Sequence, residues 1–443
     1  ESQPRPPSEP ASSATKPRTG SLPPAQPLPP LRSLDRDLTR SRVQVSSHRN
    51  RSLLANSEVW LGALRSRVAM GVLTLVLLVG VGFGIAREVH NIRVDQQRQA
   101  AQKIVDSIKQ QVASADQVSD APAKVGQLRQ ALQKTQNSQQ SIPAGDYTTL
   151  STSIQGKIDQ VEQLAHFGSV QTLGDFSAEK QIAISRVLVD GDIVYALDQN
   201  AHRIGVLTLS GGKPAFPLAP GVKAGTDVVG NVTAMTLAPT GLFAMDDRHV
   251  LWLYDKTKKD VNRVKVNGSE NWQEPRGLVT QGDKLLVVDA KQNRIFQYTM
   301  SGTSFGPATD YLAPAPAGQA PDLAHSSDVT ADATSVFVLL VDGSVLKFNK
   351  GERASFAESG LAENIVSPSG IFANGRDAAV YVADPSNRRV VKFAKDGRFL
   401  QQLKLPNDQD KLGTIQALYV DEAQNRAVLA TEASLSIASL GAP

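Results

Sequence analysis

An aspartate followed five residues later by an arginine recurs in the C-terminal part of the chain. The pairs are Asp198 with Arg203, Asp289 with Arg294, and Asp384 with Arg389. A ring of such charges on one face of a domain would bind an anion or a peptide. The pair also has a structural use, because an aspartate accepts hydrogen bonds from turn N–H groups and an arginine can pair with it or with the neighbouring blade. Because the pairs recur with the fold, we interpret them as structural.

A repeated unit of strand, turn and strand positions these pairs. The stretch from Val380 to Phe393, VYVADPSNRRVVKF, is typical: a β-branched strand breaks at turn formers and resumes as a second strand. The fifth residues of the six units are Asp198, Asp246, Asp289, Leu340, Asp384 and Thr431. Six units with a period of about 47 residues predict a mainly β fold, a six-bladed β-propeller over residues 168–443.

The last unit lacks an outer strand, and residues 169–176 supply one extra candidate at the front. We predict that this segment completes the last blade, because an open ring would expose two sheet edges.

The stretches VADPSNRRVVKFAKDG and VVDAKQNRIFQY resemble NHL-type repeats, and SPSGIFA and EPRGLV resemble the Pro-x-Gly start of such blades. The resemblance implies a six-bladed propeller. Three units depart from it: Asp246 has no arginine at the matching place, Leu340 replaces the aspartate, and the last unit keeps only the strand pattern. The resemblance therefore implies the architecture and no particular ligand.

A six-bladed propeller can also hold a cation in its central channel, which would make the chain a lactonase-like hydrolase. Such a site needs several oxygen ligands from the starts of the inner strands. Asn231, Glu274 and Asp328 occupy such places. The set is small, and the six histidines show no HxH or HExxH spacing. We predict no catalytic residue, metal or cofactor in this segment and keep the hydrolase as the alternative.

Two Pro/Gly-rich inserts interrupt the repeats at 214–230 and 305–328. Loops on a rigid scaffold are the usual place of recognition. We name Trp272, Tyr311 and His325 as candidate ligand-binding residues in this part of the chain.

Residues 87–167 are predicted to form a helical stalk, either a hairpin bundle or a coiled coil. Apolar residues at 101, 104, 108, 112 and 115 make one stripe, and residues 150–164 carry another. Such stripes would allow a homodimer through the stalk.

Residues 68–86 are uncharged and would form a helix of about 28 Å, which predicts a single transmembrane helix. The preceding residues 1–67 are rich in Pro and Arg and are predicted to be disordered. Their arginines place the N-terminus in the cytoplasm at the plasma membrane and the propeller outside, and would bind anionic lipid.

Composition excludes several classes of protein. Without cysteine, the chain has no disulfide, thiolate metal site or Cys nucleophile. The net charge of +4 comes from one flank, because residues 1–67 carry +6 and the remainder carries −2. We therefore expect no nucleic acid as partner.

The order of linker, membrane helix and propeller resembles a bacterial architecture in which a cytoplasmic Ser/Thr kinase or metal-dependent protein phosphatase is joined to an outside propeller. The first residue is Glu, so we expect such a domain upstream. The sequence predicts a membrane-anchored sensor or scaffold that binds an extracytoplasmic protein or a small ligand.

Overall fold

The computed structural model describes residues 61–175, 182–316, 320–406, 413–431 and 434–441. For residues 61–74, 76, 82–86, 89 and 175 it describes the backbone alone. The chain divides into two units after Gly84, and the second unit, Ile85–Pro443, contains the end of the first helix, two further helices and a β-propeller. The tail predicted to be disordered lies outside the described residues as far as residue 60.

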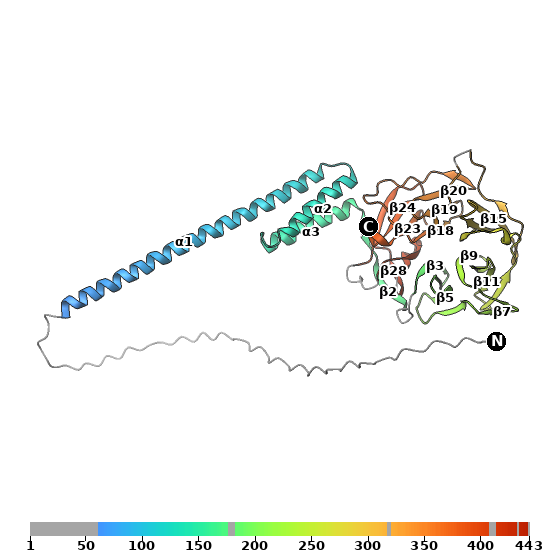
Figure 1. Cartoon of the computed structure of the whole chain (residues 1–443), viewed down its shortest axis with the longest axis horizontal. Helices are drawn as coiled ribbons and strands as arrows, with labels where there is room; N and C mark the ends of the chain where they lie inside the picture. The colour runs from blue at the N-terminus through green and yellow to red at the C-terminus, as the bar shows by residue number, and fades with distance from the viewer. Residues whose placement is uncertain (1–60, 176–181, 317–319, 407–412, 432–433, 442–443) are drawn as a thin grey trace, which may run out of the picture. The chain divides into compact units, whose positions relative to one another are not determined.

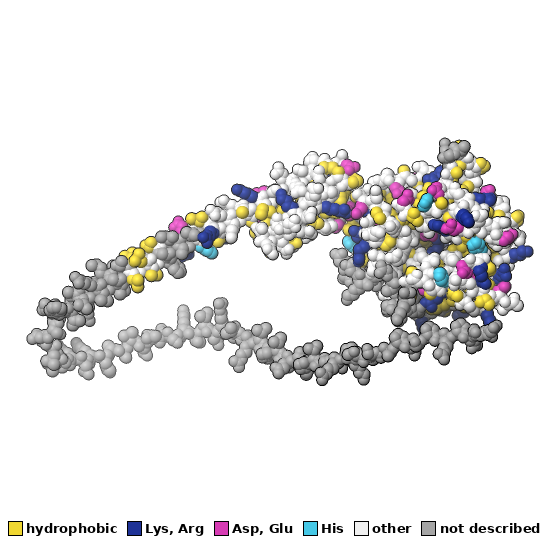
Figure 2. Space-filling model, in the orientation of Figure 1, with side chains coloured by type: hydrophobic (Ala, Val, Ile, Leu, Met, Phe, Trp, Pro, Cys, Tyr) yellow, Lys and Arg dark blue, Asp and Glu magenta, His cyan; other side chains and the backbone are white. Residues whose placement is uncertain are grey.

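Helix α1 (Leu61–Asp116) includes the predicted membrane segment. Figure 2 shows hydrophobic side chains gathered on the described part of this helix. They belong to Leu75, Leu77, Leu78, Val79 and Val81, which are 55–66% exposed. Within the part of the chain that the structure describes, no helix is both long enough and apolar enough to cross a membrane. Most side chains of the segment 68–86 lie outside the described residues.

The C-terminal part of α1 packs with α2 (Ala121–Asn137) and α3 (Ala144–Val161) around one apolar core. Asp120 caps α2 by accepting a hydrogen bond from the Ala123 amide at 3.0 Å. The predicted stripe on α1, with Ile108 fully buried, meets Leu128 of α2 and Ile154 of α3 in this core. The stripe is therefore buried inside the chain, and the homodimer through the stalk stays a prediction.

The described residues of the C-terminal part form six sheets of four or more strands around a common axis, and this confirms the six-bladed propeller (Figure 1). We number the blades 1–6 by their inner strands, β3 (Ile184–Asp190), β9 (Val232–Ala238), β13 (Pro275–Gln281), β18 (Ser326–Ala331), β22 (Gly370–Ala373) and β26 (Ala417–Asp421). The second strands are β4 (Ile193–Asp198), β10 (Gly241–Asp246), β14 (Lys284–Asp289), β19 (Ser335–Leu340), β23 (Ala379–Asp384) and β27 (Arg426–Ala430).

The third and outer strands complete each blade. The third strands are β5 (Arg203–Thr208), β11 (Leu251–Asp255), β15 (Arg294–Ser301), β20 (Val345–Asn349), β24 (Arg389–Ala394) and β28 (Ser434–Ser439). The outer strands are β6 (Ala215–Leu218), β12 (Asp260–Val264), β16 (Ser304–Phe305) with β17 (Thr309–Asp310), β21 (Glu352–Ala354), β25 (Phe399–Lys404) and β2 (Gly168–Asp175). A short hairpin, β7 (Lys223–Ala224) and β8 (Asp227–Val228), lies in the first insert.

Strands from the N-terminal side close the ring. β2 pairs antiparallel with β28, so blade 6 combines strands from the two ends of the propeller, as predicted. β1 (Leu164–His166) adds to blade 5 as a fifth strand, parallel to β25, which the sequence did not predict. The chain leaving α3 is therefore hydrogen-bonded into two adjacent blades.

Packing between blades explains why the second strands are apolar without alternation. All six residues of β23 are buried. Tyr381 belongs to the core shared with blade 6, whereas Val380 and Val382 belong to the core shared with blade 4. A sheet covered on both faces requires apolar residues at successive positions, and this produces the repeated pattern in the sequence.

Candidate functional site

The repeated aspartates lie at the hairpins between the second and third strands. In blade 5, Asp384 and Arg389 are 0% and 3% exposed, and Arg389 Nε donates to Asp384 Oδ2 at 2.9 Å. The Arg389 guanidinium also donates to the carbonyls of Glu363 and Asn364. Asp384 accepts the Val366 amide at 3.4 Å. The pair thus holds the loop that precedes the inner strand of the same blade, which we call the leading loop.

The aspartate keeps this role in other blades while the arginine varies. Asp198 accepts the Ala183 amide of its leading loop at 3.2 Å and pairs with Arg203 at 3.4 Å. Asp289 accepts the amides of its leading loop at Gln273 and Glu274. The predicted pairing of Asp289 with Arg294 is wrong: Arg294 binds Asp310 at 2.7 Å, because β17 brings that carboxylate beside β15.

In blade 2, the arginine that pairs with Asp246 stands two residues after it and not five. Arg248, two residues on, donates to the carboxylate, and so do the Trp252 indole and the amides of Val250 and Gly230. Burial acts to raise the pKa of Asp246, but these hydrogen bonds hold it below its usual range. The hairpin carboxylates are structural groups with their acceptor capacity in use.

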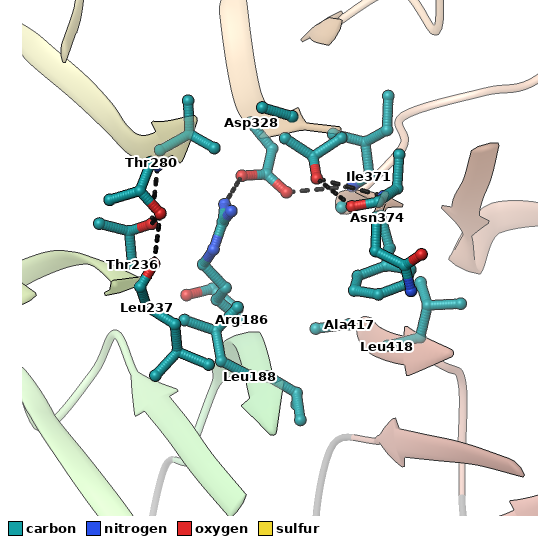
Figure 3. Close-up of a pocket in the computed structure, with 18 residues that line it drawn as sticks. Arg186, Leu188, Thr236, Leu237, Thr280, Asp328, Ile371, Asn374, Ala417 and Leu418 are labelled. Carbon is teal, nitrogen blue, oxygen red and sulfur yellow. Dashed lines mark hydrogen bonds and ion pairs between the residues drawn. The ribbon is translucent and has the colours of Figure 1, made fainter. Parts of the chain in front are cut away.

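The inner strands of all six blades surround a central cavity of about 230 Å³ (Figure 3). Its polar feature is an ion pair between Arg186 of blade 1 and Asp328 of blade 4, which lie opposite each other in a ring of six. Arg186 Nη2 also donates to the Val329 carbonyl at 2.8 Å. Asp328 Oδ2 accepts the Ile371 amide of blade 5 at 3.0 Å. The pair therefore crosses the channel and joins three blades.

Small residues make room for this pair. In each blade, one position of the inner strand pairs with the residue that immediately precedes the fifth residue of the repeated unit, on the second strand. These positions are Arg186, Ala234, Gly277, Asp328, Gly370 and Ala417. A Cβ on Gly277 would lie 2.5 Å from Val329 Cγ1, and one on Gly370 would lie 3.6 Å from Asp328 Oδ2. The four Ala and Gly positions leave the space that the two charged side chains occupy.

The sequence reasoning missed Arg186 and assigned Asp328 a different role. Superimposing the six units by strand register would have shown two opposite charges among four small residues, and this was the available signal. Burial raises the pKa of Asp328, while Arg186 and the amides of Ile371 and Val329 act in the opposite direction. The carboxylate thus has a cation and two amide donors as partners.

The three candidate metal ligands each have separate partners. Asp328 binds Arg186, the Glu274 carboxylate accepts from Arg276 at 2.6 Å, and Asn231 Nδ2 donates to Asp247 at 2.8 Å. Within the described ranges, no group of three or more His, Asp or Glu side chains could hold a metal ion. The predicted donor set does not form in this arrangement.

The three candidate ligand-binding residues are not brought together. Trp272 is 3% exposed in the core shared by blades 2 and 3, where its Nε1 donates to the Tyr298 hydroxyl at 2.7 Å. Tyr311 is buried in the core shared by blades 3 and 4. The His325 side chain is exposed and contacts Asp322 at 3.1 Å. Two of the three are core residues, because the large aromatic side chains of Trp272 and Tyr311 fill space between blades.

A chain of polar side chains, buried from Glu162 to Asp384, joins the helices to blade 5. Arg129 of α2 binds Glu162, at the end of α3, at 2.8 Å, and Glu162 accepts from Gln402 of β25 at 2.9 Å. Gln402 Oε1 accepts from Arg389 at 3.1 Å, and Arg389 binds Asp384. Glu162 and Gln402 are 6% and 2% exposed. Arg129 also reaches the Glu363 carboxylate in the leading loop of blade 5 at 3.2 Å.

No protein-family model and no curated protein matches the chain. Similar solved structures include a nidogen/laminin complex, with 17% identity, 54% of this chain and 84% of that chain covered, and a TM-score of 0.39. They also include Kuenenia stuttgartiensis hydrazine synthase (9%, 59% and 96%, 0.40) and the computationally designed Ika8 protein (12%, 63% and 99%, 0.36).

At these TM-scores the likenesses carry no argument, and the fold assignment rests on the strand pairing. The resemblance to NHL repeats and to receptor-type kinases or phosphatases stays a prediction.

Proposed function

We propose that the chain is a binding protein, a sensor or scaffold that presents its propeller on a helical bundle. The observation that carries this is the chain of hydrogen bonds and ion pairs from the half-exposed Arg129 through the buried Glu162, Gln402 and Arg389 to Asp384. Buried polar chains are destabilising when one member loses its partner. A change in the leading loop of blade 5 would therefore alter contacts inside the helical bundle.

The hydrolase alternative has less support. Its metal would need Asp328 as a ligand, and that carboxylate already has Arg186 and two backbone amides as partners. Displacing Arg186 would leave a guanidinium in a channel lined by Thr and apolar residues, which is costly. The Arg186–Asp328 pair therefore links blades across the channel, which fits a structural role for Asp328 better than a role as a cation ligand.

The membrane anchor is part of the proposal. Its support is the uncharged segment 68–86 and the exposure of five apolar side chains between Leu75 and Val81. We further propose that the arginine-rich flank lies on the cytoplasmic side and that the propeller is extracytoplasmic. Cell fractionation of the full chain and of a chain lacking 68–86 tests the anchor, since only the former should sediment with membranes.

Photo-crosslinking in the native cells tests the binding function. A crosslinkable amino acid placed at exposed positions of the propeller, with one position per blade, should capture the same partner from one face. The hydrolase would be supported instead by metal-dependent turnover of a lactone panel that is lost in Asp328→Asn. Absence of any crosslinked partner together with such turnover would contradict the proposal.

A further inference from the structure

A groove of about 610 Å³ lies between blades 4 and 5. One wall is the hairpin between β19 and β20, residues 341–344, and the other is the leading loop of blade 5, residues 358–367. Gly343, at φ +96°, lets the hairpin approach the loop closely, since a Cβ there would lie 3.0 Å from Ile365 Cβ. The volume is in the range of ligand pockets.

The groove occurs where the repeat fails. In blade 4, Leu340 and Ser344 stand where blade 5 has Asp384 and Arg389. The hairpin therefore has no carboxylate or guanidinium at these positions with which to hold a loop. Instead, the Val345 amide donates at 2.9 Å to Oε1 of Glu358, which comes from the leading loop of the next blade. The groove lies beside this hydrogen bond between Val345 and Glu358.

The groove is negatively charged. Glu358 and Asp342 line it, and no described lysine or arginine does. Burial raises the pKa of Glu358, and the nearby Asp342 acts in the same direction. Asp342 Oδ1 accepts from the Ser344 amide and hydroxyl. Among the described residues, neither carboxylate forms an ion pair with a lysine or arginine of the chain.

The groove is also apolar at its rim. Among the described residues of the second unit, the exposed large hydrophobic side chains are Ile92, Val228, Val341 and Val366. Val341 and Val366, 50% and 51% exposed, line the two opposite walls of this groove. Paired apolar side chains beside unpaired carboxylates complement a segment that carries a cation next to an aliphatic side chain.

We propose that this groove binds a peptide segment of a partner protein in which a lysine or arginine neighbours an aliphatic residue. The cation would approach Glu358 and Asp342, and the aliphatic side chain would lie between Val341 and Val366. This inference rests on the proposed binding function and assigns it a site and a partner chemistry.

The position of the groove connects it to the helices. Val366, in its wall, donates its amide to Asp384, and the preceding Glu363 and Asn364 are held by Arg389. The Glu363 side chain contacts Arg129 of α2. A peptide that moves this loop therefore acts on the first link of the polar chain that leads into the bundle.

The test uses the full chain and a fluorescent hexapeptide pool with lysine and valine fixed at adjacent positions, measured by anisotropy. The variant Asp342→Asn/Glu358→Gln keeps the oxygen acceptors for Ser344 and Val345 and removes the charges. Val341→Ser/Val366→Ser removes the apolar rim. Asp283→Asn and Val228→Ser are matched controls, since both side chains are exposed outside the groove.

We expect each groove variant to weaken binding of the pool by about tenfold, and the controls to bind like the original chain. Unchanged melting temperatures would show that the variants fold. A pool with glutamate in place of lysine should not bind.

Equal binding by groove variants and original chain would overturn the groove while leaving a propeller-binding function in place. Displacement of the pool by millimolar calcium alone would overturn the peptide in favour of a cation site. If neither the pool nor any crosslinked partner binds the original chain, the proposed function fails together with the groove.

Discussion

The hairpins of blades 4 and 5 occupy the same place in the repeat and do different things. In blade 5, Asp384 and Arg389 are buried, hold the leading loop of their own blade, and connect through Gln402 to the helices. In blade 4, Leu340 and Ser344 replace them, and a charged residue, Asp328, stands instead at the channel position of the inner strand. Blade 5 has Gly370 at that inner position.

The comparison shows that charged residues can stand at different positions in two blades while both blades keep the same strand arrangement. The strand pattern supports the blade, because apolar burial on both faces supplies most of the stability. The polar groups then decide which loops are held and which are left to line a groove. Four changes test this account.

The largest effect is expected from Asp384→Ala. It leaves Arg389 buried without its carboxylate, and breaking a buried pair costs about 3–5 kcal/mol. Urea denaturation of the full chain, followed by tryptophan fluorescence, would measure the loss. A cost below about 1 kcal/mol would mean that the blade 5 pair is no more structural than a surface pair.

A smaller loss is expected from Arg186→Ala, about 2–3 kcal/mol, because the cross-channel pair is slightly more accessible. The double variant Arg186→Ala/Asp328→Ala should be more stable than Arg186→Ala alone, since it leaves no buried carboxylate unpaired. The same urea titrations give both values. A double variant that is less stable by the sum of the two single costs would show that the two side chains do not interact.

Blade 2 keeps the repeat aspartate, Asp246, but lacks an arginine five residues later. The pH dependence of stability can therefore test the contribution of this carboxylate. Because the pKa of Asp246 is lowered on folding, its stabilisation is present above the usual aspartate range and is lost as pH falls through the folded pKa. Asp246→Asn should therefore flatten the fall in the urea midpoint between about pH 5 and pH 2. An unaltered pH profile would show that the Asp246 carboxylate does not contribute to the pH dependence of stability.

The smallest effect is expected from Arg294→Ala. The pair of Arg294 with Asp310 has side chains 41% and 56% exposed, and exposed pairs contribute about 0–1 kcal/mol. Thermal melting of the variant beside Asp384→Ala would compare the two arginines of the repeat directly. A loss of stability as large as that of Asp384→Ala would contradict the distinction between the buried pair of blade 5 and the exposed pair of blade 3.

The sequence by itself determined the number of blades, the order of their strands and the closure by β2. Those features depend on local turn chemistry and on apolar runs that recur with a fixed period, and both can be read along the chain. The helical stripe that includes Ile108 was equally visible.

The tertiary structure alone decided which charges meet. Arg186 and Asp328 are 142 residues apart and pair only because blades 1 and 4 face each other across a closed ring. Arg294 binds Asp310, and not Asp289, because the outer strand β17 brings Asp310 beside it. Burial of Trp272 and Tyr311, and the groove beside Val341, likewise depend on how neighbouring blades pack, since contacts between distant residues are fixed by packing and not by local spacing.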